Sequence, residues 1–510
     1  MLRNRHLVIA ISLIFSASSL LFAANLQAAP AAALAAGVLI ANFLLWRGMA
    51  ESPLLARKLE TPWLLALLAV GAGLALLGGE GHLVFAKDDW LVRDAVLADL
   101  SAHGLAARYE DAGGLAMLRA PLGFYLLPAA FGRLLGLGAA HVAMLAQTAS
   151  IVAGFFYCAT LLWPKRRGLF VLLFAIFAGL DILPVLMKTD AAWIPRYLAF
   201  WVDGMYYPPN LSQLFWSPNH VLPGWWFAAL AALHIRREID FTTLAASSLP
   251  LLFWSPLTTP GCAGLLMFFF LRAPGAALTP RLALLGLAAL GLAPIVAYFL
   301  TGAGDTPHRL AFDAEFFNDY PIFVPFSLAQ AFFVLALWRR VDLAMRGALV
   351  ASLLLLLAIP VVRVGAMSDF VQRASIAPHA LLAFAFNALL IDLLPAGGLA
   401  FVLGGAIAAI GAVGPALEIW DSLATPRWSI SDCDMATANR KYTGRATLMA
   451  HYFAPVAAMP AWLFKTLDAA APLRPEERLC WSDRVYGEAR FNYMKPQYLI
   501  WLRKTETAQK

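Results

Sequence analysis

Long apolar segments of roughly twenty residues recur along most of the chain and are separated by short polar loops. A helix needs about 20 apolar residues to cross the hydrocarbon layer of a bilayer, so the pattern predicts membrane-spanning helices. We expect about thirteen, at 7–25, 28–47, 62–79, 138–163, 168–187, 219–235, 241–257, 259–272, 281–301, 322–338, 346–362, 370–393 and 397–416. Segment 119–136 contains Pro121, Pro128 and Arg133. It is either a short span or a helix that lies at the interface.

The composition supports a membrane protein. Hydrophobic residues make up 61% of the chain and charged residues only 14%, whereas soluble domains contain about 25% charged residues. The fold class is therefore predicted to be an all-α polytopic membrane protein. The start of the chain is similar to a signal peptide, but its apolar stretch is nearly long enough to span a membrane, so we expect an uncleaved first helix.

The basic residues predict the orientation. The net charge is +7, and Lys and Arg accumulate in cytoplasmic loops of membrane proteins. All basic loops face the cytoplasm only if 119–136 does not cross, which puts the N-terminus inside and the tail outside. If 119–136 crosses, one basic loop breaks the rule. No separate basic domain stands apart from the loops, so we expect no nucleic-acid partner.

The preferred orientation divides the chain into two parts. Residues 1–416 form the transmembrane domain, and residues 417–510 form a small polar C-terminal region on the outer side. Loops 80–118, 188–218, 302–321 and 363–369 lie on the same outer side. Cys433 and Cys480 lie in the polar tail. In an oxidising compartment they could form a disulfide, and two unpaired thiols are the alternative.

The stretch "KDDWLVRDAVLADL" in loop 80–118 concentrates charge in a chain that otherwise avoids it. Its spacing predicts an amphipathic helix at the interface, with Arg93, Asp94 and Asp99 on or near the polar side. Asp88 and Asp89 precede it. One of them suits a helix N-cap, but a cap does not explain two. Paired acidic side chains at a membrane surface favour chemistry, cation binding or proton transfer.

An acidic pair in the first large outer loop resembles the pattern of GT-C superfamily glycosyltransferases, such as aminoarabinose and protein O-mannosyl transferases. The stretches "RAPLGFYLLPAAFGRLLG" and "SDFVQRASIAPHALLAFAF" are similar to later segments of such enzymes. The resemblance covers the general layout of residues 60–416, although this chain has two spans before the one that leads into the loop. It implies a GT-C-like bundle, a sugar donor linked to polyprenyl phosphate, and an Asp base that acts with inversion.

The chemistry of sugar transfer selects the candidate residues. A carboxylate takes the proton of the acceptor hydroxyl, and cations stabilise the leaving lipid phosphate. We expect Asp88 and Asp89 to be catalytic. The expected phosphate-binding residues are Arg373, Arg363, Lys188 and Arg196, and the expected substrate-binding residues are His220, Asp203, Lys87 and Arg93. Snorkelling to the interface is the alternative for Arg373, and capping or packing is the alternative for His220.

Two other functions stay open. A transporter or flippase of a lipid-linked saccharide would need charges near the midplane and paired broken helices, and a scaffold protein would need neither. A divalent cation is one option for the second carboxylate, and we expect no organic cofactor. The expected acceptor is a glycan, glycolipid or protein of the cell envelope. The expected location is the bacterial inner membrane, with the site facing the periplasm or the outside.

Overall fold

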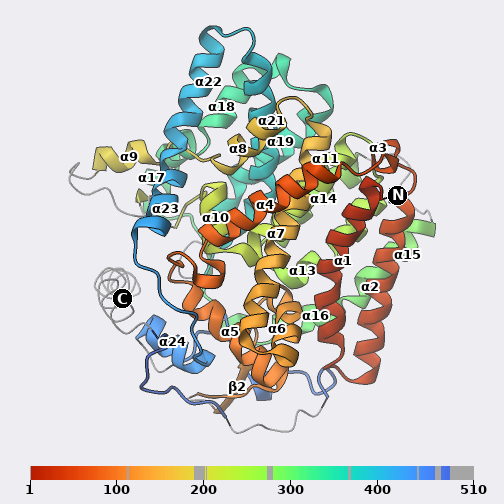
Figure 1. The fold of residues 1–510 in the computed structure, drawn as a ribbon, viewed down its shortest axis with the longest axis vertical. Helices are drawn as coiled ribbons and strands as arrows, with labels where there is room; N and C mark the ends of the chain where they lie inside the picture. The colour runs from red at the N-terminus through yellow and green to blue at the C-terminus, as the bar shows by residue number, and fades with distance from the viewer. Residues whose placement is uncertain are drawn as a thin grey trace.

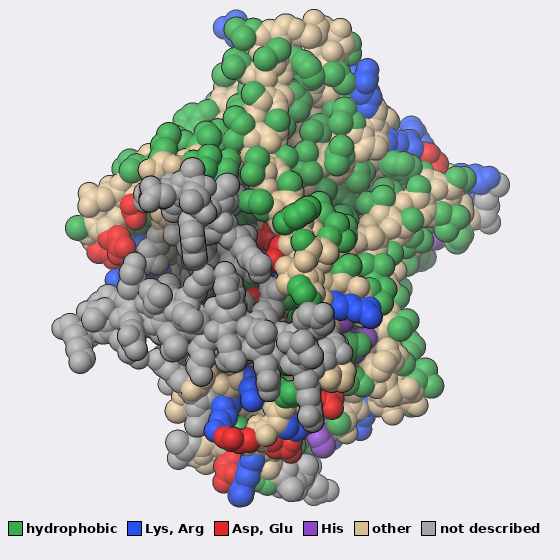
Figure 2. Space-filling model, turned by 60° about the vertical axis from the view of Figure 1, so that its left-hand side comes forward, with side chains coloured by type: hydrophobic (Ala, Val, Ile, Leu, Met, Phe, Trp, Pro, Cys, Tyr) green, Lys and Arg blue, Asp and Glu red, His purple; other side chains and the backbone are tan. Residues whose placement is uncertain are grey.

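The computed structural model describes residues 2–111, 114–188, 201–202, 204–272, 280–365, 369–444, 447–465 and 472–482. In this part of the chain the protein is a bundle of helices with two small sheets. Strand β2 (Gly114–Leu118) lies at the lower end of the view in Figure 1, below α5 (Trp90–His103) and α6 (Gly123–Leu135), and helix α24 (Met435–Thr443) lies to the left of α5. Figure 2 shows acidic and basic side chains gathered at that lower end, beneath a broad hydrophobic face.

Among the described residues, seven helices are long and apolar enough to cross a membrane. They are α1 (Asn4–Ala23), α2 (Ala28–Met49), α7 (Leu137–Leu162), α15–α16 (Pro280–Gly291 and Ala293–Leu300), α19 (Leu343–Ala358), α21 (Ile376–Leu393) and α22–α23 (Gly398–Gly411 and Val413–Ala424). A membrane protein built mainly from helices is therefore confirmed at this level. The count of thirteen spans is not confirmed, because several predicted spans are short or interrupted.

Most of the remaining helices are short, because several of the predicted spans are interrupted in the structure. They are α3 (Pro53–Ala56), α4 (Thr61–Leu77), α8 (Arg167–Ala175), α9 (Ile182–Lys188), α10 (Asn210–Trp216), α11 (Pro218–Ile235), α12 (Phe241–Ser248), α13 (Leu251–Trp254), α14 (Thr259–Leu271), α17 (Ala314–Ser327), α18 (Ala329–Ala336) and α20 (Asp369–Ala374). The pair α17–α18 is bent by 59° and gives an eighth span if it is counted as one. Predicted span 168–187 is interrupted between α8 and α9.

Two small sheets add to the helical architecture. Strands β1 (Tyr109–Asp111), β2 and β5 (Phe453–Pro455) form an antiparallel sheet, in which Leu118 pairs with Phe453. Strands β3 (His308–Leu310) and β4 (Val362–Val364) form a two-stranded sheet with Arg309 opposite Arg363. The first sheet joins loop 80–118 to the tail, which explains why the tail packs on the bundle.

The basic loops meet at the opposite end from these sheets. Four sets of ion pairs connect loops that are far apart in sequence: Arg167 with Glu60, Lys165 with Asp392, Arg236 with Asp342, and Arg281 with both Glu51 and Asp240. The basic loops therefore share one face, as the charge pattern predicts.

Segment 119–136 returns to the side from which it starts. At its beginning, the Arg119 N–H donates to the Tyr452 carbonyl in the tail at 2.7 Å. At its end, Gly132 packs against Ser101 of α5. Of the two alternatives for this segment, the one in which it does not cross agrees with the structure.

Close helix contacts in the bundle depend on small residues. At Gly71 of α4, an added Cβ would lie 2.6 Å from the carbonyl oxygen of Ala149 in α7. Small residues let helix backbones approach in lipid, where apolar side chains gain little by leaving the bilayer. This contact fixes α4, and with it the loop that carries Asp88 and Asp89, against the long helix α7.

The topology predicts opposite labelling of two engineered cysteines. His103 and Lys58 are exposed at opposite ends of the protein. An impermeant thiol reagent applied to spheroplasts should label His103→Cys and leave Lys58→Cys unlabelled. The native background is quiet, because Cys158 and Cys262 are buried and the two tail cysteines are bonded to each other. Labelling of Lys58→Cys alone would invert the orientation.

Candidate active site

Asp89 lies at the N-cap position of α5, but its side chain does not cap the helix. One carboxylate oxygen, Oδ1, accepts from the Tyr442 hydroxyl at 2.9 Å. The other, Oδ2, lies 3.4 Å from Nη2 of Arg93. The Asp89 side chain keeps 26% of its surface exposed, so a small molecule can reach it. Asp88 is half-buried, just outside the helix.

The polar side of α5 faces protein, and the predicted interfacial helix is therefore wrong. Arg93, Asp94 and Asp99 are each at most 3% exposed. Asp94 accepts from the Ser431 N–H at 3.0 Å and lies 2.9 Å from Nε2 of His82. The sequence pattern is amphipathic because the second face of α5 packs on polar groups of the tail.

Arg93 joins the acidic pair to the turn between α10 and α11. Its guanidinium donates to Oδ1 of Asn219 at 2.7 Å and to the backbone carbonyl of Trp216. It also lies within 3.4 Å of the Tyr125 hydroxyl of α6. Arg93 is thus a buried cation with several acceptors, and its position holds Asp89 beside residues 216–219.

Arg373 approaches the same turn from the other side. It forms an ion pair with Asp369 at 2.8 Å, and its Nη2 lies 3.4 Å from the Ser217 hydroxyl. The ion pair and the hydroxyl contact place Arg373 inside the protein rather than at a lipid surface, which disagrees with the snorkelling alternative. Two arginines from distant parts of the chain therefore bracket one turn.

The charges of these residues also meet at Tyr452 in the tail. Burial raises the pKa of the Tyr452 hydroxyl. The positive charges of Arg93 and Arg373 oppose this rise, and the negative charge of Asp89 adds to it. All three charges are therefore close enough to the Tyr452 hydroxyl to affect its pKa.

Arg363 is a buried arginine without an acidic partner in the described part of the chain. Its side chain lies in β4, is 8% exposed and packs against Gly204, where an added Cβ would be 2.6 Å from its Cζ. Its Nε and Nη2 atoms make no hydrogen bond with described residues. A desolvated guanidinium of this kind costs free energy unless an anion occupies it. The prediction that Arg363 binds phosphate is consistent with this geometry.

His220, at the start of α11, lies on the apolar side of the site. Its Nδ1 is 2.7 Å from the Ser255 hydroxyl, and Ser255 and Thr258 are hydrogen-bonded at 2.6 Å. Both hydroxyl residues line a mainly apolar pocket of about 130 Å³ together with Leu252 and Cys262. The charged centre and an apolar cavity therefore meet at one histidine.

Lys87 is placed differently from its predicted role. It is fully buried and forms ion pairs with Glu418 at 2.9 Å and Asp421 at 2.8 Å, both on α23. Since both partners are internal carboxylates, this placement favours a structural role over substrate binding. Arg196 and Asp203 lie outside the described residues, and Lys188 ends α9 with its side chain also outside them.

Several site residues escaped the sequence reasoning. Tyr442, Tyr125 and Asn219 contact the charged centre, although ordinary tyrosines and asparagines carry no distinguishing signal in a single sequence. The tail cysteines form a disulfide between Cys433 and Cys480, which decides between the two alternatives for these cysteines. No group of three or more His, Cys, Asp or Glu side chains within the described ranges is arranged to hold a metal ion, and the divalent cation stays a prediction.

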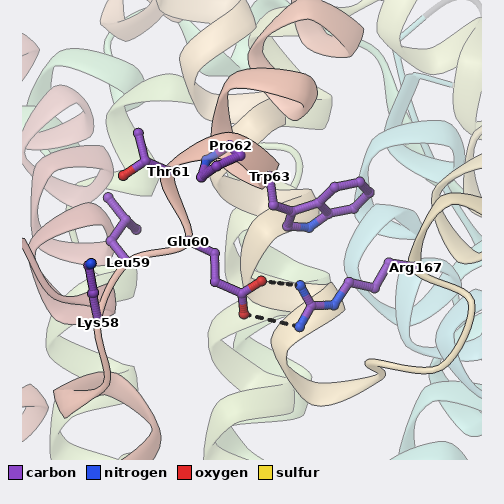
Figure 3. A pocket seen from close by; sticks show the side chains of 7 residues that line it. All are labelled: Lys58, Leu59, Glu60, Thr61, Pro62, Trp63 and Arg167. Carbon is purple, nitrogen blue, oxygen red and sulfur yellow. Dashed lines mark hydrogen bonds and ion pairs between the residues drawn. The ribbon is translucent and has the colours of Figure 1, made fainter.

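A larger pocket lies elsewhere, among the basic loops. It measures about 820 Å³ and is lined by Lys58, Glu60, Trp63, Arg167 and their neighbours. Figure 3 shows Glu60 turned toward Arg167, with two contacts between carboxylate and guanidinium. Glu60 and Arg167 neutralise each other, and the pocket is open to its surroundings. The candidate active site is therefore assigned to the centre around Asp89.

Comparisons with protein-family models, curated proteins and solved structures gave no match for this chain.

The burial of the Asp99 carboxyl group leads us to predict that the free energy of unfolding depends on pH. Burial raises the pKa of Asp99 to about 7, although the Tyr109 hydroxyl and the Met435 N–H donate to it. The folded state then binds more protons than the unfolded state above about pH 4, so stability falls as pH rises toward 7, by on the order of 4 kcal/mol.

Thermal unfolding in detergent, followed by tryptophan fluorescence between pH 4.5 and 8, measures this slope. In Asp99→Asn the amide oxygen still accepts both hydrogen bonds, so most of the slope should disappear and Tm at pH 8 should rise. Glu315→Gln, at an exposed carboxylate of α17, is the matched control and should leave the slope unchanged. An unaltered slope in Asp99→Asn would contradict the assignment.

Proposed function

We propose that this protein is a membrane glycosyltransferase that moves a sugar from a polyprenyl-phosphate donor to an acceptor hydroxyl of the cell envelope. The observation that carries the proposal is the meeting of Asp89 with Arg93, Arg373 and their shared turn. One accessible carboxylate beside fixed cations is what sugar transfer from a lipid phosphate needs.

The proposed mechanism assigns one role to each side of the site. Asp89 or Asp88 takes the proton of the acceptor hydroxyl while its oxygen attacks C1 of the sugar. The bond from C1 to the phosphate oxygen breaks on the opposite face, so the configuration at C1 inverts. Arg373 and Arg363 stabilise the negative charge that stays on the lipid phosphate. No further oxidant or cofactor is needed for this balance.

The apolar pocket beside His220 supports a lipid-linked substrate. An isoprenoid chain needs an apolar surface that begins near the phosphate position and continues toward the bilayer. The pocket lined by Leu252, Cys262 and Ser255 is mainly apolar and about 130 Å³ in volume, so it offers an apolar surface for a short part of such a chain. The Ser255 hydroxyl connects the pocket to His220, which supports the proposal that His220 binds substrate.

A second function, the transport of a lipid-linked saccharide, is favoured by one observation. The bend between α17 and α18 touches the break between α8 and α9, where the Leu180 N–H donates to the Phe326 carbonyl at 2.8 Å. Asp181 is buried there and accepts from Trp201 and from Ser327. Broken helices with a buried carboxylate are a feature of transporters. Translocation of a fluorescent lipid-linked sugar in proteoliposomes that survives loss of Asp89 would favour this function.

The acidic pair provides the direct test of catalysis. Asp88→Asn and Asp89→Asn keep the size of the side chains and remove the charge. At least one variant should lose about 10²–10⁴-fold in turnover while inserting and unfolding like the native protein. Release of radiolabelled sugar from a panel of polyprenyl-phosphate sugars, with envelope extract as acceptor, measures the effect. Full activity in both single variants would remove the catalytic role.

Arg363 tests the phosphate site and has a matched control. Arg363→Gln should raise KM for the lipid donor about 10-fold or more, since a charge-assisted contact is lost. It should also raise Tm, because a buried cation without an acidic partner among the described residues is removed. Arg309→Gln changes the residue directly opposite in the β3–β4 sheet, which is 60% exposed, and should leave KM unchanged. An unchanged KM in Arg363→Gln would exclude Arg363 from donor binding.

A further inference from the structure

The C-terminal tail donates hydrogen bonds to three carboxylates of the α5 region. Tyr442 donates to Asp89, the Ser431 N–H donates to Asp94 at 3.0 Å, and the Met435 N–H donates to Asp99 at 2.8 Å. Successive acids are five residues apart, which rotates each by about 140° from the one before it on a helix. Their partners come from one short stretch of the tail, residues 431–442, which therefore contacts more than one side of α5.

Residues 431–442 are held in place by contacts with residues 476–480 further along the tail. Cys433, just before α24, is bonded to Cys480 across 47 residues. Asp432 forms an ion pair with Arg478 at 2.9 Å, and the Glu476 N–H donates to the Thr437 hydroxyl at 3.0 Å. A nine-residue helix such as α24 has little stability of its own. Its position, and that of Tyr442 near its end, therefore depends on these contacts.

The two carboxylate oxygens of Asp89 are contacted by two different parts of the chain. Arg93 contacts Oδ2 and belongs to α5 itself, while Tyr442 contacts Oδ1 and belongs to the tail. One contact alone leaves the carboxylate free to rotate about its last bond. Two contacts, one on each oxygen, fix its plane, and a base must be oriented as well as ionised to take a proton.

We propose that Tyr442 is a positioning residue that orients the Asp89 carboxylate for proton transfer. The tail clasp, defined as residues 431–442 held to residues 476–480 by the Cys433–Cys480 disulfide and its neighbouring contacts, is then a part of the active site. The inference rests on the proposed function, since it assigns Tyr442 to the same reaction. The substrate does not touch Tyr442 in this role, because the hydroxyl acts through Asp89.

A pair of tyrosines allows a matched test. Tyr442 and Tyr109 both donate a hydroxyl to a carboxylate of α5, to Asp89 and to Asp99 respectively. Tyr442→Phe and Tyr109→Phe therefore each remove one hydroxyl that donates to a carboxylate of the α5 region. Only the first change acts on the proposed base.

The expected result is a split between kcat and KM. With the panel of polyprenyl-phosphate sugars, Tyr442→Phe should lower kcat about 10-fold with KM for the donor nearly unchanged, since orientation of a base is felt in the transition state alone. Tyr109→Phe should lower Tm and leave kcat within about 2-fold. Equal kcat for native protein and Tyr442→Phe would overturn the proposal, and so would a parallel loss in both variants.

The disulfide supplies the second arm. Both cysteines are fully buried, so replacement by serine is used rather than a reductant. Cys433→Ser with Cys480→Ser should lower kcat by a similar factor to Tyr442→Phe. The triple variant should be no slower than the double variant, because residues that act through one contact are not additive. Additive losses would overturn the link between the clasp and Tyr442.

The failure of this inference is distinguishable from the failure of the proposed function. If Asp89→Asn is inactive and Tyr442→Phe has native kcat, the proposed glycosyltransferase function is retained and the positioning role of Tyr442 is excluded. If Asp88→Asn and Asp89→Asn are both fully active, the base itself is wrong, and the orienting role of Tyr442 falls with it.

Discussion

The neutralisation of buried charge just before α5 is the constraint on which the packing around this helix depends. Lys87 is fully buried and has two carboxylate partners on α23, at 2.8 and 2.9 Å. A buried ammonium without such partners would cost several kcal/mol. The ion pairs therefore fix the end of α23 beside loop 80–118. The chain that follows α23 thus starts at the place where it must pack on α5.

The same constraint explains why α5 and the tail behave as one unit. Asp94 and Asp99 are removed from water, so each needs donors from protein, and the tail supplies them through backbone N–H groups. Backbone donors are independent of side-chain identity, which makes the docking tolerant of sequence change but dependent on an ordered tail. Asp89, at the N-cap position of α5, keeps part of its surface exposed.

The sequence predicts the apolar helices well where they are unbroken. The expected segments 7–25, 28–47 and 138–163 agree with α1, α2 and α7 to within three residues at each end. The breaks in 168–187 and 322–338 were not predicted, because a bent helix that is buried in protein has the same apolar composition as a straight one. The interfacial helix was wrong for a related reason. A polar face looks the same in sequence whether it meets water or donors from another part of the protein.

The site was predicted in part. Asp89, Arg93 and Arg373 are brought together around residues 216–219, and the sequence singled them out because charge is rare in this chain. Lys87 carried the same signal and has internal partners instead, since single-sequence reasoning cannot tell which charges pair with each other. Tyr442 carried no signal, because its role depends on a contact between residues that are 353 positions apart.

That separation has a consequence for the order of biosynthesis. Asp89 enters the membrane early, while Tyr442 and Cys480 are made only after the last predicted span has left the ribosome. The centre around Asp89 is thus incomplete until the tail has been made and its disulfide has formed. A chain that stalls during translation would contain the carboxylate and most of the arginines but lack the clasp. A half-built copy of the protein would therefore lack one of the two contacts that hold the Asp89 carboxylate.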